Sequence, residues 1–254
     1  MQTPCRMRYY LLLFPLLLAC EGVSVAPLDP PQYDPDAFES KFLEIELTPG
    51  DQQVGISNGI SLTNFQLHVP EDTSSLRPLV VALHWSGDSN AYREYFDCLA
   101  VPGLDTLDAF IIAPQDNEND WGTTINLFNV TELRRLALRH WPVDSTRLLV
   151  TGYSLGGIGT FNYADNYPEL FSAAMPMAGS YRITNPVELP VFFIHGENDE
   201  LFPLVGVEQE VQSVQDLGGQ AELLVVPNLG HGRACEYVPA LREGAAWLLD
   251  GVWR

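Results

Sequence analysis

The feature that most constrains the fold is the segment Leu149-Val150-Thr151-Gly152-Tyr153-Ser154-Leu155-Gly156-Gly157, a short apolar run that ends in a G-x-S-x-G motif. This motif is typical of a sharp turn from a strand into a helix, with the serine at the apex. Glycine is expected at positions 152 and 156 because a Cβ there would collide with the turn. Ser154 is therefore a candidate nucleophile, with a strand before it and a helix after it.

Apolar runs and helix-compatible segments alternate along the chain. Near-continuous apolar runs suit parallel strands that are covered on both faces; they lie at residues 79–83, 109–113, 148–150, 191–194 and 223–226. Helical candidates lie at residues 125–140, 155–167, 204–217 and 238–249. The alternating segment 61–69 predicts an early antiparallel strand. The pattern predicts an α/β fold with a mostly parallel sheet and helices on both faces. Because the segment between Ser180 and Pro190 is short, we expect little or no lid.

The first twenty residues differ from the rest. A basic start at Arg6 and Arg8 precedes the apolar residues 9–19, which predicts an export signal that is too short for a permanent transmembrane helix. Leu17-Leu18-Ala19-Cys20 resembles the bacterial lipobox, so Cys20 is a candidate lipidation site. The alternative is plain cleavage nearby, which would leave a periplasmic or secreted protein. The proline-rich residues 21–40 are expected to be a tether, followed by one globular domain over residues 41–254.

The net charge limits the kinds of partner that the chain can bind, and its cysteines indicate the cellular compartment. The formal net charge of −20 at pH 7 disfavours nucleic acid as a partner. Any membrane association is expected through a lipid at Cys20 alone, and the sequence leaves the oligomeric state open. Outside the signal region the sequence has two cysteines, Cys98 and Cys235. In an exported domain such a pair predicts one disulfide. The alternative is that both are separate buried thiols.

A serine nucleophile needs a base and an acid that orients the base, in the chain order serine, acid, histidine for this motif. His231 lies on a glycine-flanked loop after the last predicted strand, and three acids that follow the strand 191–194 compete for the second role: Glu197, Asp199 and Glu200. Loops at the carboxyl ends of parallel strands share one edge of the sheet. The other histidines have structural interpretations. His68 is expected within a strand, His140 at the end of a helix and His195 at a turn that it holds by hydrogen bonds. No cluster has metal-ligand spacing, so neither a metal nor another cofactor is expected.

Residues 76–249 resemble the α/β-hydrolase superfamily, and more narrowly its phospholipase/carboxylesterase and polyhydroxybutyrate-depolymerase-like or predicted-peptidase branches. The resemblance rests on VVALHWSGD, VDSTRLLVTGYSLGGIGTFNYADNYPELFSAAMPMAGSY, LPVFFIHGENDELFP and VVPNLGHG, in that order. It implies Ser154 as the nucleophile, Asp199 as the acid and His231 as the base.

The resemblance also implies an oxyanion hole formed by the backbone N–H groups of Leu155 and Ser86. The chain departs from the family pattern at Trp85, where glycine is usual. The indole could tilt the amide of Ser86, line an acyl pocket or pack over the helix that follows.

The function expected from these features is that of an exported serine carboxylesterase, acting on a small or polymeric ester through an acyl-enzyme. A peptidase, thioesterase or polyester depolymerase with the same triad is the alternative. A non-catalytic surface-binding lipoprotein is the alternative of another class.

Overall fold

A computed structural model describes residues 35–57, 62–116 and 118–254. The predicted export signal, the candidate lipidation site Cys20 and most of the predicted tether lie outside these ranges. No helix within the described ranges is long and apolar enough to cross a membrane.

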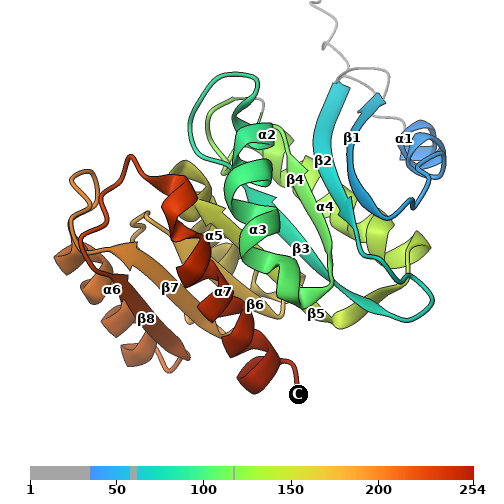
Figure 1. Cartoon of the computed structure of the whole chain (residues 1–254). Helices are drawn as coiled ribbons and strands as arrows, with labels where there is room; N and C mark the ends of the chain where they lie inside the picture. The colour runs from blue at the N-terminus through green and yellow to red at the C-terminus, as the bar shows by residue number, and fades with distance from the viewer. Residues whose placement is uncertain (1–34, 58–61, 117) are drawn as a thin grey trace, which may run out of the picture. The chain divides into compact units, whose positions relative to one another are not determined.

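The described residues contain one sheet with the strand order β1-β2-β4-β3-β5-β6-β7-β8 (Figure 1). Its strands are β1 (Gly50–Ser57), β2 (Leu62–Val69), β3 (Arg77–Leu83), β4 (Phe110–Pro114), β5 (Val143–Tyr153), β6 (Ala173–Met177), β7 (Val191–Gly196) and β8 (Ala221–Val226). β2 is antiparallel to β1 and β4, and the pairs from β4 to β8 are parallel. The predicted mostly parallel sheet with an early antiparallel strand is confirmed.

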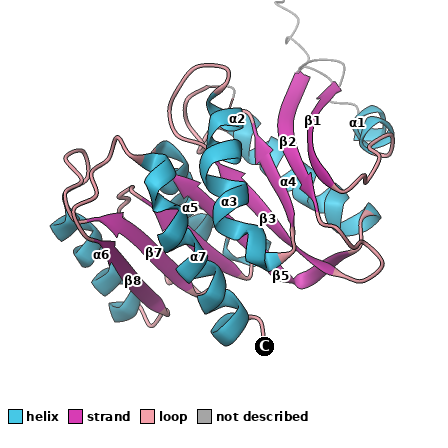
Figure 2. Ribbon diagram, in the orientation of Figure 1, coloured by secondary structure: helices cyan, strands magenta, loops and turns pink. Residues whose placement is uncertain are grey.

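Helices cover both faces of this sheet, which separates the core into two layers (Figure 2). One layer receives α1 (Pro35–Phe42), α4 (Thr124–His140), α5 (Leu155–Asn166) and α6 (Leu204–Asp216). The other receives α2 (Ala91–Tyr95), the π-helical turn η1 (Phe96–Ala100), α3 (Val101–Leu104) and α7 (Val238–Trp247). Because the strands from β4 to β8 pair in parallel, the carboxyl ends of β3, β5, β7 and β8 lie at one edge of the sheet.

The predicted boundary of the tether is wrong. Residues 35–40 belong to α1, and the side chains of Phe38 and Phe42 are fully buried in the core. Glu39 of the same helix contacts His140 at the end of α4, with 2.6 Å between Glu39 Oε1 and His140 Nε2. The folded domain therefore includes residues that the proline content had placed in the tether.

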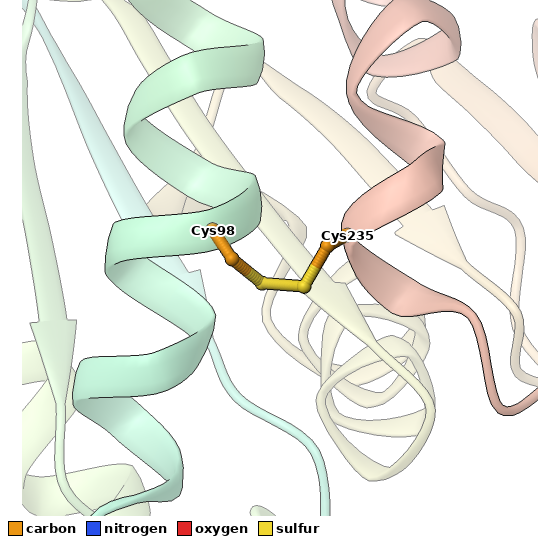
Figure 3. The surroundings of a disulfide bond; sticks show 2 residues. All are labelled: Cys98 and Cys235. Atoms are coloured by element: carbon orange, nitrogen blue, oxygen red, sulfur yellow. A yellow bond between two sulfur atoms is a disulfide. The ribbon is translucent and has the colours of Figure 1, made fainter.

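The predicted disulfide is present, between Cys98 of η1 and Cys235 of the 3₁₀ turn η4 (Ala234–Tyr237) (Figure 3). The two cysteines are 137 residues apart in the sequence. The bond joins the helical segment after β3 to the segment that follows the last strand.

Candidate active site

Ser154 stands at the strained turn between β5 and α5. Its backbone has φ of +56° and ψ of −114°, outside the regions that residues with a side chain normally occupy. The expected need for glycine is confirmed, because a Cβ at Gly152 would lie 2.3 Å from the carbonyl oxygen of Gly156, and one at Gly156 would lie 1.8 Å from that of Leu83. The turn therefore holds Ser154 in one conformation at the edge of the sheet.

The structure brings Ser154, His231 and Asp199 together. Ser154 Oγ lies 2.8 Å from His231 Nε2, and His231 Nδ1 lies 2.8 Å from Asp199 Oδ2. Since a carboxylate only accepts hydrogen bonds, Nδ1 carries the proton, and Nε2 is left to accept the hydroxyl proton of Ser154. A hydroxyl, an imidazole and a buried carboxylate thus form one line of hydrogen-bond contacts, which is the geometry that nucleophilic catalysis by a serine requires.

The three candidate acids have different contacts. The Asp199 side chain is fully buried, and its Oδ1 accepts hydrogen bonds from the N–H groups of Leu201 and Phe202. Glu200 accepts a hydrogen bond from the backbone N–H of His231 at 3.1 Å, and Glu197 accepts one from Asn228 at 2.9 Å. The two glutamates therefore bind the backbone of the loop, and Asp199 binds the imidazole ring.

The remaining histidines have hydrogen-bond partners other than Ser154. His68 is in β2 beside Asp51, and His140 ends α4 beside Glu39. His195 ends β7, donates from Nε2 to the carbonyl oxygen of Phe202 at 2.7 Å and lies 3.8 Å from Asp199 Oδ2. Burial lowers the pKa of His195, which favours the neutral ring beside the acid. The sequence predicts His195 at a turn, whereas the structure places it within β7, and its proximity to Asp199 was not predicted.

A second set of contacts fixes the loop after β3. His84 is buried, its Nε2 accepts a hydrogen bond from the N–H of Asp116 at 3.0 Å, and its Nδ1 donates to the carbonyl oxygen of Trp85 at 2.6 Å. Because the described peptide bonds are trans, holding the carbonyl of Trp85 also fixes the direction of the N–H of Ser86. Burial lowers the pKa of His84 and keeps it neutral for both contacts.

Trp85 packs against its neighbours. Its ring makes edge-to-face contacts with Tyr95 of α2 and with Tyr153, at centroid distances of 5.6 Å and 6.1 Å. Of the roles considered for this residue, packing over the helix that follows is the one that these contacts support.

No group of three or more His, Cys, Asp or Glu side chains that could hold a metal ion is found in the part of the chain that the structure describes.

The sheet order, the turn at Ser154 and the helices on both faces define the α/β-hydrolase fold. Among solved structures, the fold matches a thermostable esterase with a TM-score of 0.64, at 22% identity over 79% of this chain and 62% of that one. It also matches the fluorophosphonate-binding serine hydrolase F of Staphylococcus aureus with a TM-score of 0.65, at 12% identity over 80% of this chain and 99% of that one. These similarities concern the fold alone.

The sequence comparison then gives the family. The model of the dienelactone hydrolase family matches residues 118–248, and the chain belongs to this family. The chain is 29% identical over 115 residues to a "Putative carboxymethylenebutenolidase" of Salmonella typhimurium, a match that covers 41% of this chain and 43% of that protein. It is 30% identical over 141 residues to the poly(3-hydroxyalkanoate) depolymerase C of Paucimonas lemoignei, covering 49% of this chain and 34% of the relative. The matches thus span less than half the length of these curated relatives.

Proposed function

We propose that this chain is a serine hydrolase that cleaves carboxylic esters through an acyl-enzyme. The observation that carries the proposal is the continuous hydrogen-bonded path from Ser154 Oγ through His231 to the buried Asp199, at a strained turn on the edge of the sheet. Membership of the dienelactone hydrolase family and a relative with a depolymerase name support the same reaction class.

In the proposed reaction, Ser154 Oγ bonds to the acyl carbon while its proton moves to His231 Nε2. The tetrahedral intermediate collapses, the bond to the alcohol oxygen breaks, and His231 returns the proton to the departing alkoxide. Water then attacks the acyl carbon and gives a proton to Nε2, and Ser154 leaves and recovers it, which releases the acid. Asp199 holds the ring and stabilises its positive form.

The proposed oxyanion hole uses the N–H groups of Leu155 and Ser86. Leu155 is the first residue of α5, where the backbone N–H groups have no acceptor within the helix. The contact between His84 and the carbonyl of Trp85 supports a fixed direction for the second donor. Removing one such donor typically lowers kcat by a factor of about 10²–10³.

Hydrolysis of p-nitrophenyl acetate and butyrate tests the proposal against its alternatives, with peptide p-nitroanilides and an acyl thioester assayed in parallel. We expect ester hydrolysis that falls to background in Ser154→Ala and is unchanged in Ser180→Ala, a serine outside the proposed triad. Faster cleavage of the anilide or the thioester would assign the triad to another substrate class. Equal rates in the wild type and Ser154→Ala would remove the proposal.

We also propose that the protein is exported and anchored by a lipid at Cys20. The disulfide between Cys98 and Cys235 supports an oxidising compartment. Metabolic labelling with radioactive palmitate should label the wild type and leave Cys20→Ser unlabelled; an unlabelled wild type found in the soluble fraction would indicate plain cleavage instead.

A further inference from the structure

Phe202 contacts both the proposed orienting acid and the proposed base. Its backbone N–H donates a hydrogen bond to Asp199 Oδ1 at 2.8 Å. Its ring lies 5.4 Å from the imidazole of His231, measured between centroids, at an interplanar angle of 54°. Aromatic rings at such a separation pack in contact. One residue outside the proposed triad therefore touches both partners of Ser154.

The backbone of Phe202 is held on both sides. The next residue is Pro203, which has no N–H, so the carbonyl of Phe202 is the only hydrogen-bonding group of the peptide bond between them. His195 Nε2 donates a hydrogen bond to this carbonyl oxygen at 2.7 Å. Proline also restricts the residue before it to extended backbone conformations. Phe202 is thus left with little freedom except in the torsion angles of its own side chain.

His195 makes one polar contact of this kind and no other. It is 1% exposed, and its Nδ1 has no hydrogen-bond partner among the described residues. Burial lowers the pKa of His195, so the ring is neutral and its proton lies on Nε2, toward Phe202. The distance of 3.8 Å from Nε2 to Asp199 Oδ2 is too long for a hydrogen bond. An apolar side chain could fill this space without the cost of burying a polar ring, and it would lack the bond to Phe202.

The imidazole of His231 must keep one orientation through the proposed reaction. Half a turn of the ring about its Cβ–Cγ bond would put carbon atoms in place of Nδ1 and Nε2. The contacts with Asp199 and Ser154 would then both be lost. The rings of Phe202 and Tyr153 pack against the imidazole, the latter at a centroid distance of 5.6 Å. These contacts oppose the rotation, because the imidazole cannot turn without displacing a neighbouring ring.

We propose that Phe202 is a positioning residue that keeps the imidazole of His231 in line with Ser154, and that His195 positions Phe202 through its backbone carbonyl. The inference rests on the proposed role of Ser154 as a nucleophile, and it adds two residues to that site. Both act through His231 rather than on the substrate. Loss of either contact should therefore lower kcat, which depends on proton transfer through His231, more than it changes KM.

The role of the ring is tested with p-nitrophenyl butyrate. Phe202→Leu removes the ring, and we expect kcat to fall between about tenfold and about 100-fold, while KM changes by less than about threefold. Phe202→Tyr keeps the ring and should restore most of kcat. Phe192→Leu is the matched control, because it removes a ring that packs on Trp247 instead. This control should leave kcat unchanged, and urea unfolding of each variant measures its stability.

The role of His195 depends on its donor at Nε2. His195→Gln places an amide nitrogen at a similar distance from the backbone, whereas His195→Met fills the space without a donor. We expect kcat to fall about tenfold in the methionine variant, the effect of one lost hydrogen bond, and less in the glutamine variant. If His195→Met does not fold, His195→Asn takes its place, because its amide is too short to reach the carbonyl of Phe202.

A combined variant tests whether His195 acts through the ring of Phe202. His195→Met together with Phe202→Leu should be no slower than Phe202→Leu alone, because the ring that His195 positions is already absent. Two losses that multiply would show that the two residues act on kcat independently.

The outcomes are distinct. An unchanged kcat in Phe202→Leu, a loss confined to KM, or an equal loss of kcat in Phe192→Leu would overturn the role of Phe202. Losses that multiply in the combined variant, or equal losses in His195→Met and His195→Gln, would overturn the role of His195. In all these cases the esterase proposal stands. If the wild type does not hydrolyse the ester, or Ser154→Ala hydrolyses it equally well, the proposed function fails, and this inference fails with it.

Discussion

The hydroxyl of Tyr153 donates a hydrogen bond to the backbone carbonyl oxygen of His231, across 78 residues of sequence. Tyr153 is the residue before Ser154, and its ring lies 5.6 Å from the imidazole of His231, measured between centroids. Burial raises the pKa of Tyr153, so the phenol keeps its proton. The turn that carries the proposed nucleophile therefore also holds the loop that carries the proposed base.

Replacing Tyr153 by phenylalanine tests this link. The variant should lower kcat for ester hydrolysis about tenfold or less and destabilise the fold by about 1 kcal/mol, the usual net contribution of one hydrogen bond. Tyr163→Phe is the matched control, because its buried hydroxyl contacts the carbonyl oxygen of Asn126 instead. Steady-state kinetics and urea unfolding of both variants provide the comparison. An equal loss of kcat in the two variants would show that Tyr153 acts through general stability alone.

The disulfide acts on the same loop, because Cys235 follows His231 closely in the sequence. A bond that closes a loop of this length contributes about 2–5 kcal/mol to stability. The double variant Cys98→Ser, Cys235→Ser should lose stability of that order in urea unfolding, and dithiothreitol should then have no further effect. We expect kcat at 25 °C to fall as well. Full activity in the folded double variant would show that the bond does not position His231.

The elements that the sequence predicted are those with a strong local signal. The turn at Ser154 requires glycines that the sequence displays, and the parallel strands are uninterrupted apolar runs. β6 (Ala173–Met177) was not predicted, because its alanine and proline residues have low strand propensity and only burial between β5 and β7 forms the strand. α1 was hidden by the proline-rich segment before it, although Phe38 and Phe42 mark its buried side.

The site was predicted to a similar extent. Chain order and loop position selected Ser154 and His231, but the residues alone left three acids open, because the choice depends on which carboxylate faces the imidazole. The contact of Tyr153 with His231 joins segments that are distant in the sequence. The contact of His84 with Trp85 depends on the orientation of the imidazole ring. Neither relationship leaves a periodic pattern in the sequence.

Asp199 and Glu200 are adjacent acids that should give different kinetic results. Asp199→Asn should lower kcat by about 10⁴, since an amide in place of the carboxylate favours the wrong tautomer of the histidine. Glu200→Gln should cost much less, because it only weakens an exposed hydrogen bond to the backbone N–H of His231. The kcat of each variant with p-nitrophenyl butyrate decides the matter, and a reversed order would assign the orienting role to Glu200.

The buried histidines predict how stability depends on pH. Burial lowers the pKa of both His84 and His195 below the ordinary value of 6.5, so the unfolded chain binds their protons first as the pH falls. Their contribution to the free energy of unfolding is complete above pH 6.5. It is lost as the pH falls toward the lower pKa values that the two histidines have in the folded state. The free energy of unfolding should decrease between pH 7.5 and 5.5 by up to about 1.4 kcal/mol per pH unit for each histidine. Urea unfolding of His195→Gln should show a smaller dependence; an unchanged slope would exclude His195 as a contributor.

The most direct test of the central claim is the reaction of the full chain with a fluorophosphonate, followed by mass spectrometry of the intact protein and its peptides. The account predicts one phosphonyl group per chain on the peptide that contains Ser154. No labelling should occur in Ser154→Ala, and labelling of His231→Ala should be slower by orders of magnitude. A label on another residue, no label on the wild type, or an equal rate in His231→Ala would contradict the assignment of Ser154 as a nucleophile activated by His231.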